Sequence, residues 1–231
     1  MQLHHPEELF DIFHGSENDS GWLVLSRRIG KKIKKTKVPP SIIKGLLKRI
    51  YELRDISFSS VRFTGLPLLL NLHDIPCITV SLPKSGNLDH HLALLRIEKA
   101  GLPLPTASID DTQSIHLLWS CDLPFQLNEF YIVAAIKNAI IVALQDMLPA
   151  QSNLNISNQI PIPGTINTAT NQYVGVPSIR APHSKKYLQE SILEHLNAHR
   201  YQVLTEQAGR VLELRALFDS GWWSINNETP H

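Results

Sequence analysis

Cysteine is scarce in this sequence, and that scarcity argues against a secreted domain held together by disulfides. Among 231 residues only Cys77 and Cys121 occur, both beside apolar neighbours, which favours buried, reduced thiols. Their spacing does not match the C-x-x-C pairs of zinc sites. The first residues lack the basic and apolar regions of a signal peptide. The longest apolar stretch, 131–148, carries Lys137 and Asp146 and is too polar to span a bilayer. We therefore expect a cytoplasmic protein with no membrane partner.

Signatures of several enzyme classes are missing as well. The chain has no Walker loop, no G-x-S-x-G serine elbow, no H-E-x-x-H zinc motif and no histidine-hydrophobic-histidine relaxase motif. Apolar residues make up 43% of the chain and charged residues 19%. Such a composition can bury enough apolar surface to fold, so it excludes a disordered or collagen-like protein.

The charge of the chain is balanced in total, 22 basic residues against 21 acidic, but it is unevenly distributed. Seven of the eleven residues in 27–37 are basic, and they are Arg27, Arg28, Lys31, Lys32, Lys34, Lys35 and Lys37. A cluster of this density can bind the phosphates of a nucleic acid in a salt-dependent way. The alternative is a solvated loop or hairpin without a ligand.

Hydrophobic periodicity predicts an alternation of strands and helices. Strand patterns occur near 22–26, 56–63, 77–82, 106–109 and 115–120, and helical spacing occurs over 41–55, 88–100, 127–148, 185–200 and 201–218. This order indicates an α+β fold, a sheet packed against helices. We expect one domain over 1–178 and a C-terminal helical extension with a flexible terminus over 179–231. The helices of that extension either pack against the sheet or dock another protein.

A single histidine, His116, lies in one of the predicted strands. In an extended strand Ile115, Leu117 and Trp119 share one face, and His116 lies on the other. Its imidazole could therefore point toward a groove and bind a phosphate or nucleotide. A partly buried, hydrogen-bonded core histidine is the alternative.

A proline–glycine segment, 161–168, forms a second candidate site. Proline fixes the backbone before Gly164, and glycine permits a tight turn. Thr165 and Asn167 then place a hydroxyl and an amide beside backbone N–H groups, a possible cradle for phosphate or a nucleic-acid backbone. A polar surface turn without a ligand is the alternative.

Taken in order, these motifs resemble a known family. The succession G-L-P-x-P at 101–105, H-L-x-W at 116–119, a long helix and P-G-T-x-N at 163–167 is similar to primase–polymerases of the archaeo-eukaryotic primase superfamily. Such proteins are carried by plasmids, phages and other mobile elements, and the resemblance covers about 21–174. It implies a sheet like the RNA-recognition motif beside an α/β unit, a single-stranded or primer–template DNA partner, and a nucleotide contact at His116.

Catalysis in that family uses three carboxylates that hold two divalent metal ions. The resemblance places Thr79, Ser81 and Asn155 at these positions, and none of the three is acidic. Hydroxyl and amide groups are poor substitutes around Mg²⁺ or Mn²⁺, because they bring no negative charge. We therefore expect no catalytic residue, metal or cofactor, and a DNA-binding pseudoenzyme that supports replication or transfer of a plasmid or other mobile element.

Two other functions stay open. The protein could be an active nucleotidyltransferase, a DNA primase–polymerase, with Mg²⁺ or Mn²⁺ held unconventionally by Asp74, Asp110, Asp111 or the segment 89–91. It could instead be an interaction module whose C-terminal helices dock a helicase, initiator or recombinase.

Overall fold

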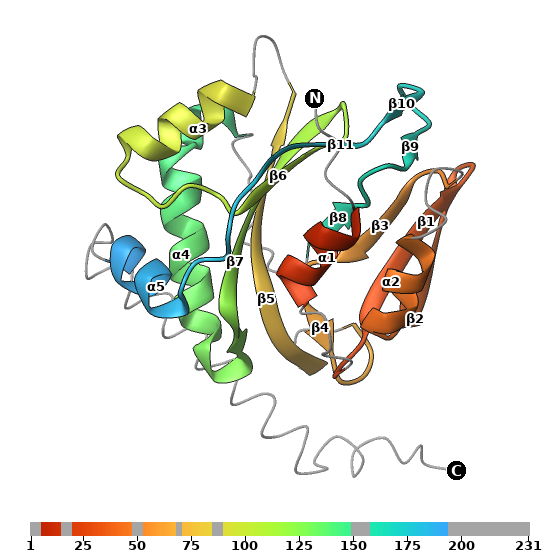
Figure 1. Cartoon of the computed structure of the whole chain (residues 1–231), viewed down its shortest axis with the longest axis horizontal. Coiled ribbons are helices and arrows are strands. Elements are labelled where there is room, and N and C mark those ends of the chain that lie inside the picture. Colours follow the sequence, from red (N-terminus) through yellow and green to blue (C-terminus); the bar gives the residue numbers. More distant parts are fainter. Residues whose placement is uncertain are drawn as a thin grey trace, which may run out of the picture.

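Two antiparallel sheets face each other across the molecule (Figure 1). The computed structural model describes residues 6–14, 20–47, 53–67, 71–84, 90–148 and 158–193. The four-stranded sheet has the order β2-β1-β3-β8, with β1 Leu23–Ile29, β2 Lys32–Val38, β3 Ile56–Ser59 and β8 Gln159–Pro161. The five-stranded sheet has the order β11-β6-β7-β5-β4, with β4 Arg62–Phe63, β5 Leu72–Pro83, β6 Ala107–Asp110, β7 Ser114–Gln126 and β11 Gly175–Ile179. A short ribbon pairs β9 Ile166–Asn167 with β10 Gln172–Tyr173.

The helices cover both sheets. They are α1 Pro6–His14, α2 Pro40–Leu47, α3 His90–Lys99, α4 Phe130–Ala143 and α5 Lys185–Leu193, with 3-10 turns at Leu127–Glu129 and Gln145–Met147. In Figure 1, α3, α4 and α5 lie on one side of the five-stranded sheet, and α1 lies between the two sheets. No helix in the described part of the chain is long and apolar enough to cross a membrane. The α+β fold predicted from the sequence is confirmed.

Strand β7 divides the interior into two cores. Ile115, Leu117 and Trp119 pack in the core under α4, whereas Leu118 belongs to a second core shared with α1 and the four-stranded sheet. The Trp119 indole Nε1–H donates to the Pro103 carbonyl at 2.8 Å, so this large side chain is buried without an unpaired donor. The alternation expected from the sequence is therefore present, with apolar residues on both faces.

The segment 56–63, predicted as one strand, is two strands in different sheets. β3 pairs with β1 and β8, and β4 pairs with β5. Two hydrogen bonds of Ser59 stabilise the crossing between the sheets: the Val24 N–H donates to the Ser59 hydroxyl at 3.0 Å, and the Ser59 hydroxyl donates to the Val61 carbonyl at 2.8 Å. Alternation alone could not predict this crossing, because both halves keep the same period of two.

The boundary predicted after residue 178 falls inside β11. Beyond it, the His183 N–H donates to the Ser120 carbonyl of β7 at 3.0 Å. Leu188 of α5 is buried in the core that α4 shares with the five-stranded sheet. The beginning of the predicted extension is thus packed on the sheet domain, and the helix predicted over 201–218 lies outside the described residues.

A buried ion pair joins β4 to β5. Arg62 and Asp74 are register partners, with side chains 1% and 2% exposed. The guanidinium forms two hydrogen bonds to the carboxylate, one of them from Nε to Oδ1 at 2.6 Å. Bidentate geometry of this kind satisfies a buried carboxylate and fixes the relative position of its two strands.

We expect Asp74→Ala to lower the free energy of unfolding by about 3–5 kcal/mol, because it leaves the Arg62 charge buried without its carboxylate. Urea unfolding would measure the change. The matched control is Glu190→Ala, which breaks the exposed Lys186–Glu190 pair and should cost only ~0.3–0.5 kcal/mol. Equal losses in the two variants would contradict a structural role for the buried pair.

Candidate nucleotide and nucleic-acid interface

A chain of three side chains crosses the inner face of the five-stranded sheet. Ser81 on β5 and His116 on β7 are register partners, and the Ser81 hydroxyl lies 2.8 Å from His116 Nδ1. On the other side of the ring, His116 Nε2 lies 3.1 Å from the Asp111 carboxylate. A carboxylate only accepts, so Nε2 carries a proton, and in a neutral ring Nδ1 accepts from the Ser81 hydroxyl. Both ring nitrogens of the predicted nucleotide contact therefore already have partners.

Asp111 is held in its ionised form. Burial alone raises the pKa of this carboxyl, but the hydrogen bond and charge of His116 lower it, together with the N–H groups of Ser114 and Gln113. The net pKa lies below its usual value. Asp111 is thus a stable negative charge at the tip of the β6–β7 hairpin.

Thr79 lies two residues from Ser81 on the same face of β5 and is buried. Its hydroxyl accepts a hydrogen bond from the Asn158 side-chain amide at 2.8 Å, and its carbonyl accepts a second at 3.2 Å. The backbone of Asn158 pairs with Ser60, so this residue connects the two sheets. Asn155, the third position expected from the sequence, lies outside the described residues.

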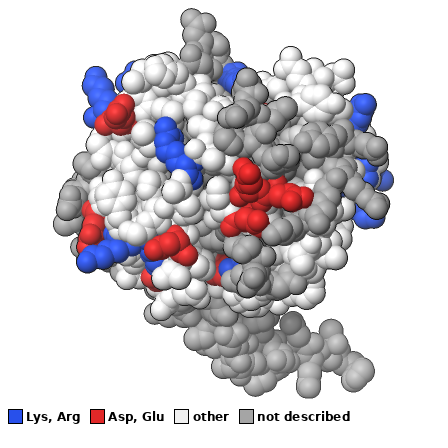
Figure 2. Space-filling model, viewed as in Figure 1, with Lys and Arg blue, Asp and Glu red and all other residues white. Residues whose placement is uncertain are grey.

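The basic run 27–37 forms the β1–β2 hairpin, one of the structures that the sequence left open. All seven predicted basic residues are exposed. Lys and Arg side chains gather at the right edge of the surface in Figure 2, on the side where Figure 1 shows this hairpin. The register distributes them over two faces. Arg27 and Lys34 are cross-strand partners on one face, whereas Arg28 and Lys35 lie on the other with Ser26. Lys37 lies over the Trp22 ring, 4.8 Å from its centroid.

The turn at 163–167 is less open than the sequence suggested. The Thr165 side chain is 1% exposed and its hydroxyl donates to the Ile162 carbonyl at 2.7 Å. The N–H groups of Gly164 and Thr165 donate to the Val174 and Ile162 carbonyls. The Asn167 amide donates to the Asp111 carbonyl at 2.6 Å. The expected exposed cradle is corrected: these groups close the turn and attach it to the β6–β7 hairpin.

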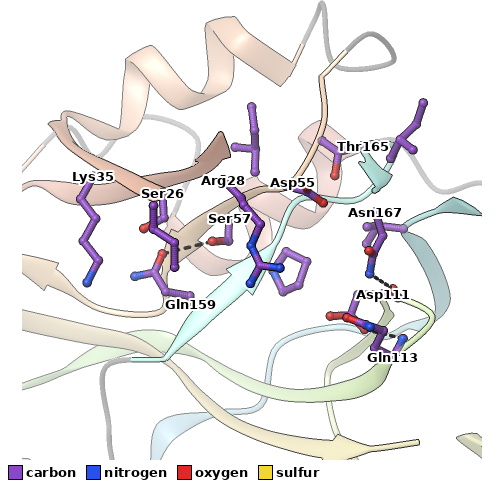
Figure 3. Close-up of a pocket in the computed structure, with 15 residues that line it drawn as sticks. Ser26, Arg28, Lys35, Asp55, Ser57, Asp111, Gln113, Gln159, Thr165 and Asn167 are labelled. Carbon is purple, nitrogen blue, oxygen red and sulfur yellow. Dashed lines mark hydrogen bonds between the residues drawn. The ribbon is translucent and has the colours of Figure 1, made fainter. Parts of the chain in front are cut away.

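A cavity of about 320 Å³ lies between the basic hairpin and this turn. Figure 3 shows Arg28 and Lys35 extending toward it from the four-stranded sheet, with Asp111 and Gln113 across from them. Predicted residues from both segments therefore meet at one site: Arg28, Lys35, Thr165 and Asn167 all line the cavity. Arg27 and Lys34 do not line it.

Two solved structures are similar in fold to this chain. The AEP domain (PP-N190) of the cyanophage S-2L primase–polymerase gives a TM-score of 0.57 at 12% identity, covering 82% of this chain and 96% of that one. The catalytic domain of the primase RepB′, solved in complex with initiator DNA, gives 0.50 at 10% identity, covering 91% of this chain and 97% of that one. The fold is archaeo-eukaryotic primase-like. No family model matches the chain, and a search of curated proteins gave no match.

The described residues do not fit the two-metal centre that the resemblance to primase–polymerases implies. Ser81 and Thr79 offer hydroxyls that are bonded to His116 and Asn158. In the part of the chain that the structure describes, no three His, Cys, Asp or Glu side chains converge as a metal site would require. A divalent ion prefers anionic oxygen ligands, and neutral hydroxyls and amides do not balance its charge.

The acidic residues that the sequence offered as alternative metal ligands already have other partners where the structure describes them. Asp74 is paired with Arg62, and Lys84 donates to Asp110 at 2.7 Å. Asp111 accepts from His116 and from two backbone N–H groups. Asp89 lies outside the described residues. Asp74, Asp110 and Asp111 therefore each accept from different donors instead of converging on one point.

Sequence reasoning missed several residues of the cavity, including Ser26, Ser57 and Gln159. They lie on three strands, and only the register places them together: Ser26 is opposite both Lys35 and Ser57, and Ser57 donates to Gln159 at 3.3 Å. The available signal was that Ser26 and Arg28 are two residues apart and so share one face of a strand. The pairing of β1 with β3 was not visible in the sequence.

The pH dependence of stability should show how much the Asp111 carboxylate contributes to the fold. Asp111→Ala removes the acceptor of three N–H donors, so we expect a loss of about 1–3 kcal/mol in unfolding free energy near pH 7. Because the folded pKa is depressed, this stabilisation is present above the unfolded pKa of ~3.9 and is lost as pH falls through the folded value. Denaturation at pH 7 and pH 3 should show the difference shrinking at pH 3.

The control for that experiment is Asp146→Ala, which removes an exposed carboxylate 3.6 Å from Arg96 and should change stability little. An Asp111→Ala loss of the same size at both pH values would refute the ionic contribution.

Proposed function

We propose that this primase-like protein binds DNA without catalysing nucleotidyl transfer, and that it serves replication or transfer of a plasmid or other mobile element. The observation that carries the proposal is the hydrogen bonding of Thr79 and Ser81. Both hydroxyls are bonded within the protein, at positions where the resemblance to primases expects catalytic carboxylates. The exposed basic hairpin supplies charge for phosphates.

The partner in this proposal is single-stranded or primer–template DNA. RepB′ was solved with initiator DNA, which makes DNA the first ligand to test. Phosphate contacts by Lys and Arg hold a strand without reading its sequence. His116 is proposed to contact a nucleotide only when Ser81 or Asp111 releases one of its ring nitrogens.

DNA binding should fall steeply with salt. For single strands the log–log slope is about −0.7 for each phosphate contacted, because counterions are released. Replacing Lys31, Lys32, Lys34 and Lys35 together by Ser should flatten this slope and weaken binding to any base sequence. Filter binding across a salt series would measure both effects.

The control for the salt series is His116→Ala, which should leave the slope nearly unchanged while lowering affinity for a nucleoside triphosphate. Binding by the quadruple variant that matches the parent at every salt concentration would mean that the hairpin is only a solvated surface.

Primer synthesis should be absent with Mg²⁺ or Mn²⁺. The test is incorporation of labelled nucleotides on a single-stranded template, compared with a mock purification. Asp introduced together at Thr79, Ser81 and Asn155 is the informative counterpart, because one carboxylate alone should not hold two metal ions. Template-dependent extension by the parent protein would overturn the proposed inactivity and favour an active primase–polymerase.

A further inference from the structure

The cavity between the hairpin and the turn contains a buried hydroxyl without a partner. Ser26 is 5% exposed, lines the cavity, and its Oγ has no hydrogen-bond partner among the described residues. Leaving a buried hydroxyl unpaired costs free energy, so a ligand that pairs with it is favoured. The volume of about 320 Å³ lies at the lower end of the ~300–1,000 Å³ range of small-molecule sites.

The side chains around Ser26 favour an anion. Lys35 is its cross-strand partner on one side and Ser57 on the other, which places a cation and a second hydroxyl in one row. Arg28 follows two residues along β1 on the same face and also lines the cavity. Phosphate is the anion that guanidinium, ammonium and hydroxyl groups bind together in proteins.

The opposite side of the cavity accepts hydrogen bonds. Asp111 and Gln113 line that side, whereas Asp55 lines the cavity next to Arg28, whose backbone N–H donates to the Asp55 carbonyl at 3.1 Å. Existing hydrogen bonds hold both carboxylates in place, since Asp55 accepts from the Thr168 N–H at 2.8 Å and Asp111 accepts from the N–H groups of Gln113 and Ser114. A sugar hydroxyl or a base amino group would suit these acceptors, and a second phosphate would be repelled.

We propose that this cavity binds one nucleotide through a single phosphate. The phosphate is held by Arg28, Lys35 and the Ser26 hydroxyl, and the nucleoside extends toward Asp111 and Gln113. The ligand is either a free nucleoside monophosphate or one nucleotide of a single strand. The strand form rests on the proposed DNA binding, whereas the free form does not.

The hairpin offers a matched pair of variants for the test. Arg28→Gln with Lys35→Gln removes two charges from the face that lines the cavity. Arg27→Gln with Lys34→Gln removes two charges from the opposite face of the same strands, where the two residues are cross-strand partners. All four side chains are exposed, so neither variant should unfold the protein. Circular dichroism and urea unfolding check this.

Calorimetry with thymidine monophosphate, thymidine triphosphate and inorganic phosphate measures the free form, and fluorescence anisotropy with labelled oligothymidylate measures the strand form. In physiological salt, the variant of the cavity face should lose at least about tenfold in affinity for thymidine monophosphate or for the oligonucleotide, the scale of one hydrogen bond to a charged group. The variant of the opposite face should lose clearly less. Ser26→Ala should also weaken binding, because it removes the unpaired hydroxyl of the cavity.

The outcomes separate this inference from the proposed function. Monophosphate binding that depends on Arg28 and Lys35 supports the free form, and oligonucleotide binding alone with the same dependence supports the strand form. If monophosphate does not bind, DNA binding that both double variants weaken equally overturns the cavity and leaves the proposed function intact. Absence of DNA binding by the parent refutes the proposed function, and absence of monophosphate binding as well refutes both. Triphosphate bound more tightly than monophosphate in the cavity would also overturn the inference.

Discussion

The buried pair between Arg62 and Asp74 sets the geometry on which the rest of the structure depends. The chain leaves the four-stranded sheet at Ser59 and enters the five-stranded sheet at Arg62, within three residues. Such a short crossing is stable only if the second strand is fixed at once, and a bidentate ion pair with both side chains buried does this. The ion pair thereby holds β5 in the position in which Ser81 contacts His116 and Thr79 contacts Asn158.

The same register sets the partners of Thr79 and Ser81, at positions where the resemblance to primase–polymerases implies metal-binding carboxylates. Three carboxylates close together repel one another unless cations neutralise them. Here hydroxyls occupy two of the expected positions and bond to His116 and Asn158, so the arrangement is satisfied without a cation. The remaining charge of Asp111 is balanced by donors that include the histidine itself.

Much of the fold was predictable from local sequence, because strands and helices carry their own periodicity. The side of β7 on which His116 lies followed from alternation, and the primase-like fold followed from the order of motifs. The crossing at Ser60 was not predictable, since it depends on hydrogen bonds between residues far apart in the sequence: the Val24 N–H donates to Ser59, and the Ser60 N–H donates to the Asn158 carbonyl. The candidate cavity was only half predictable: the sequence showed Arg28 and Lys35 as charged but could not show that Arg27 and Lys34 face away from them.

The β1–β2 hairpin carries basic residues on both faces, one toward the cavity and one toward the outer surface. An exposed β-ribbon presents alternate residues to opposite sides, so a continuous basic run necessarily divides its charge. The charges on the outer face act at a distance and are screened by salt over about 8–10 Å. Those on the inner face act beside a buried hydroxyl and two carboxylates, where screening is weaker and geometry matters more. One run of sequence can thus attract a polyanion and, on its inner side, position a single phosphate.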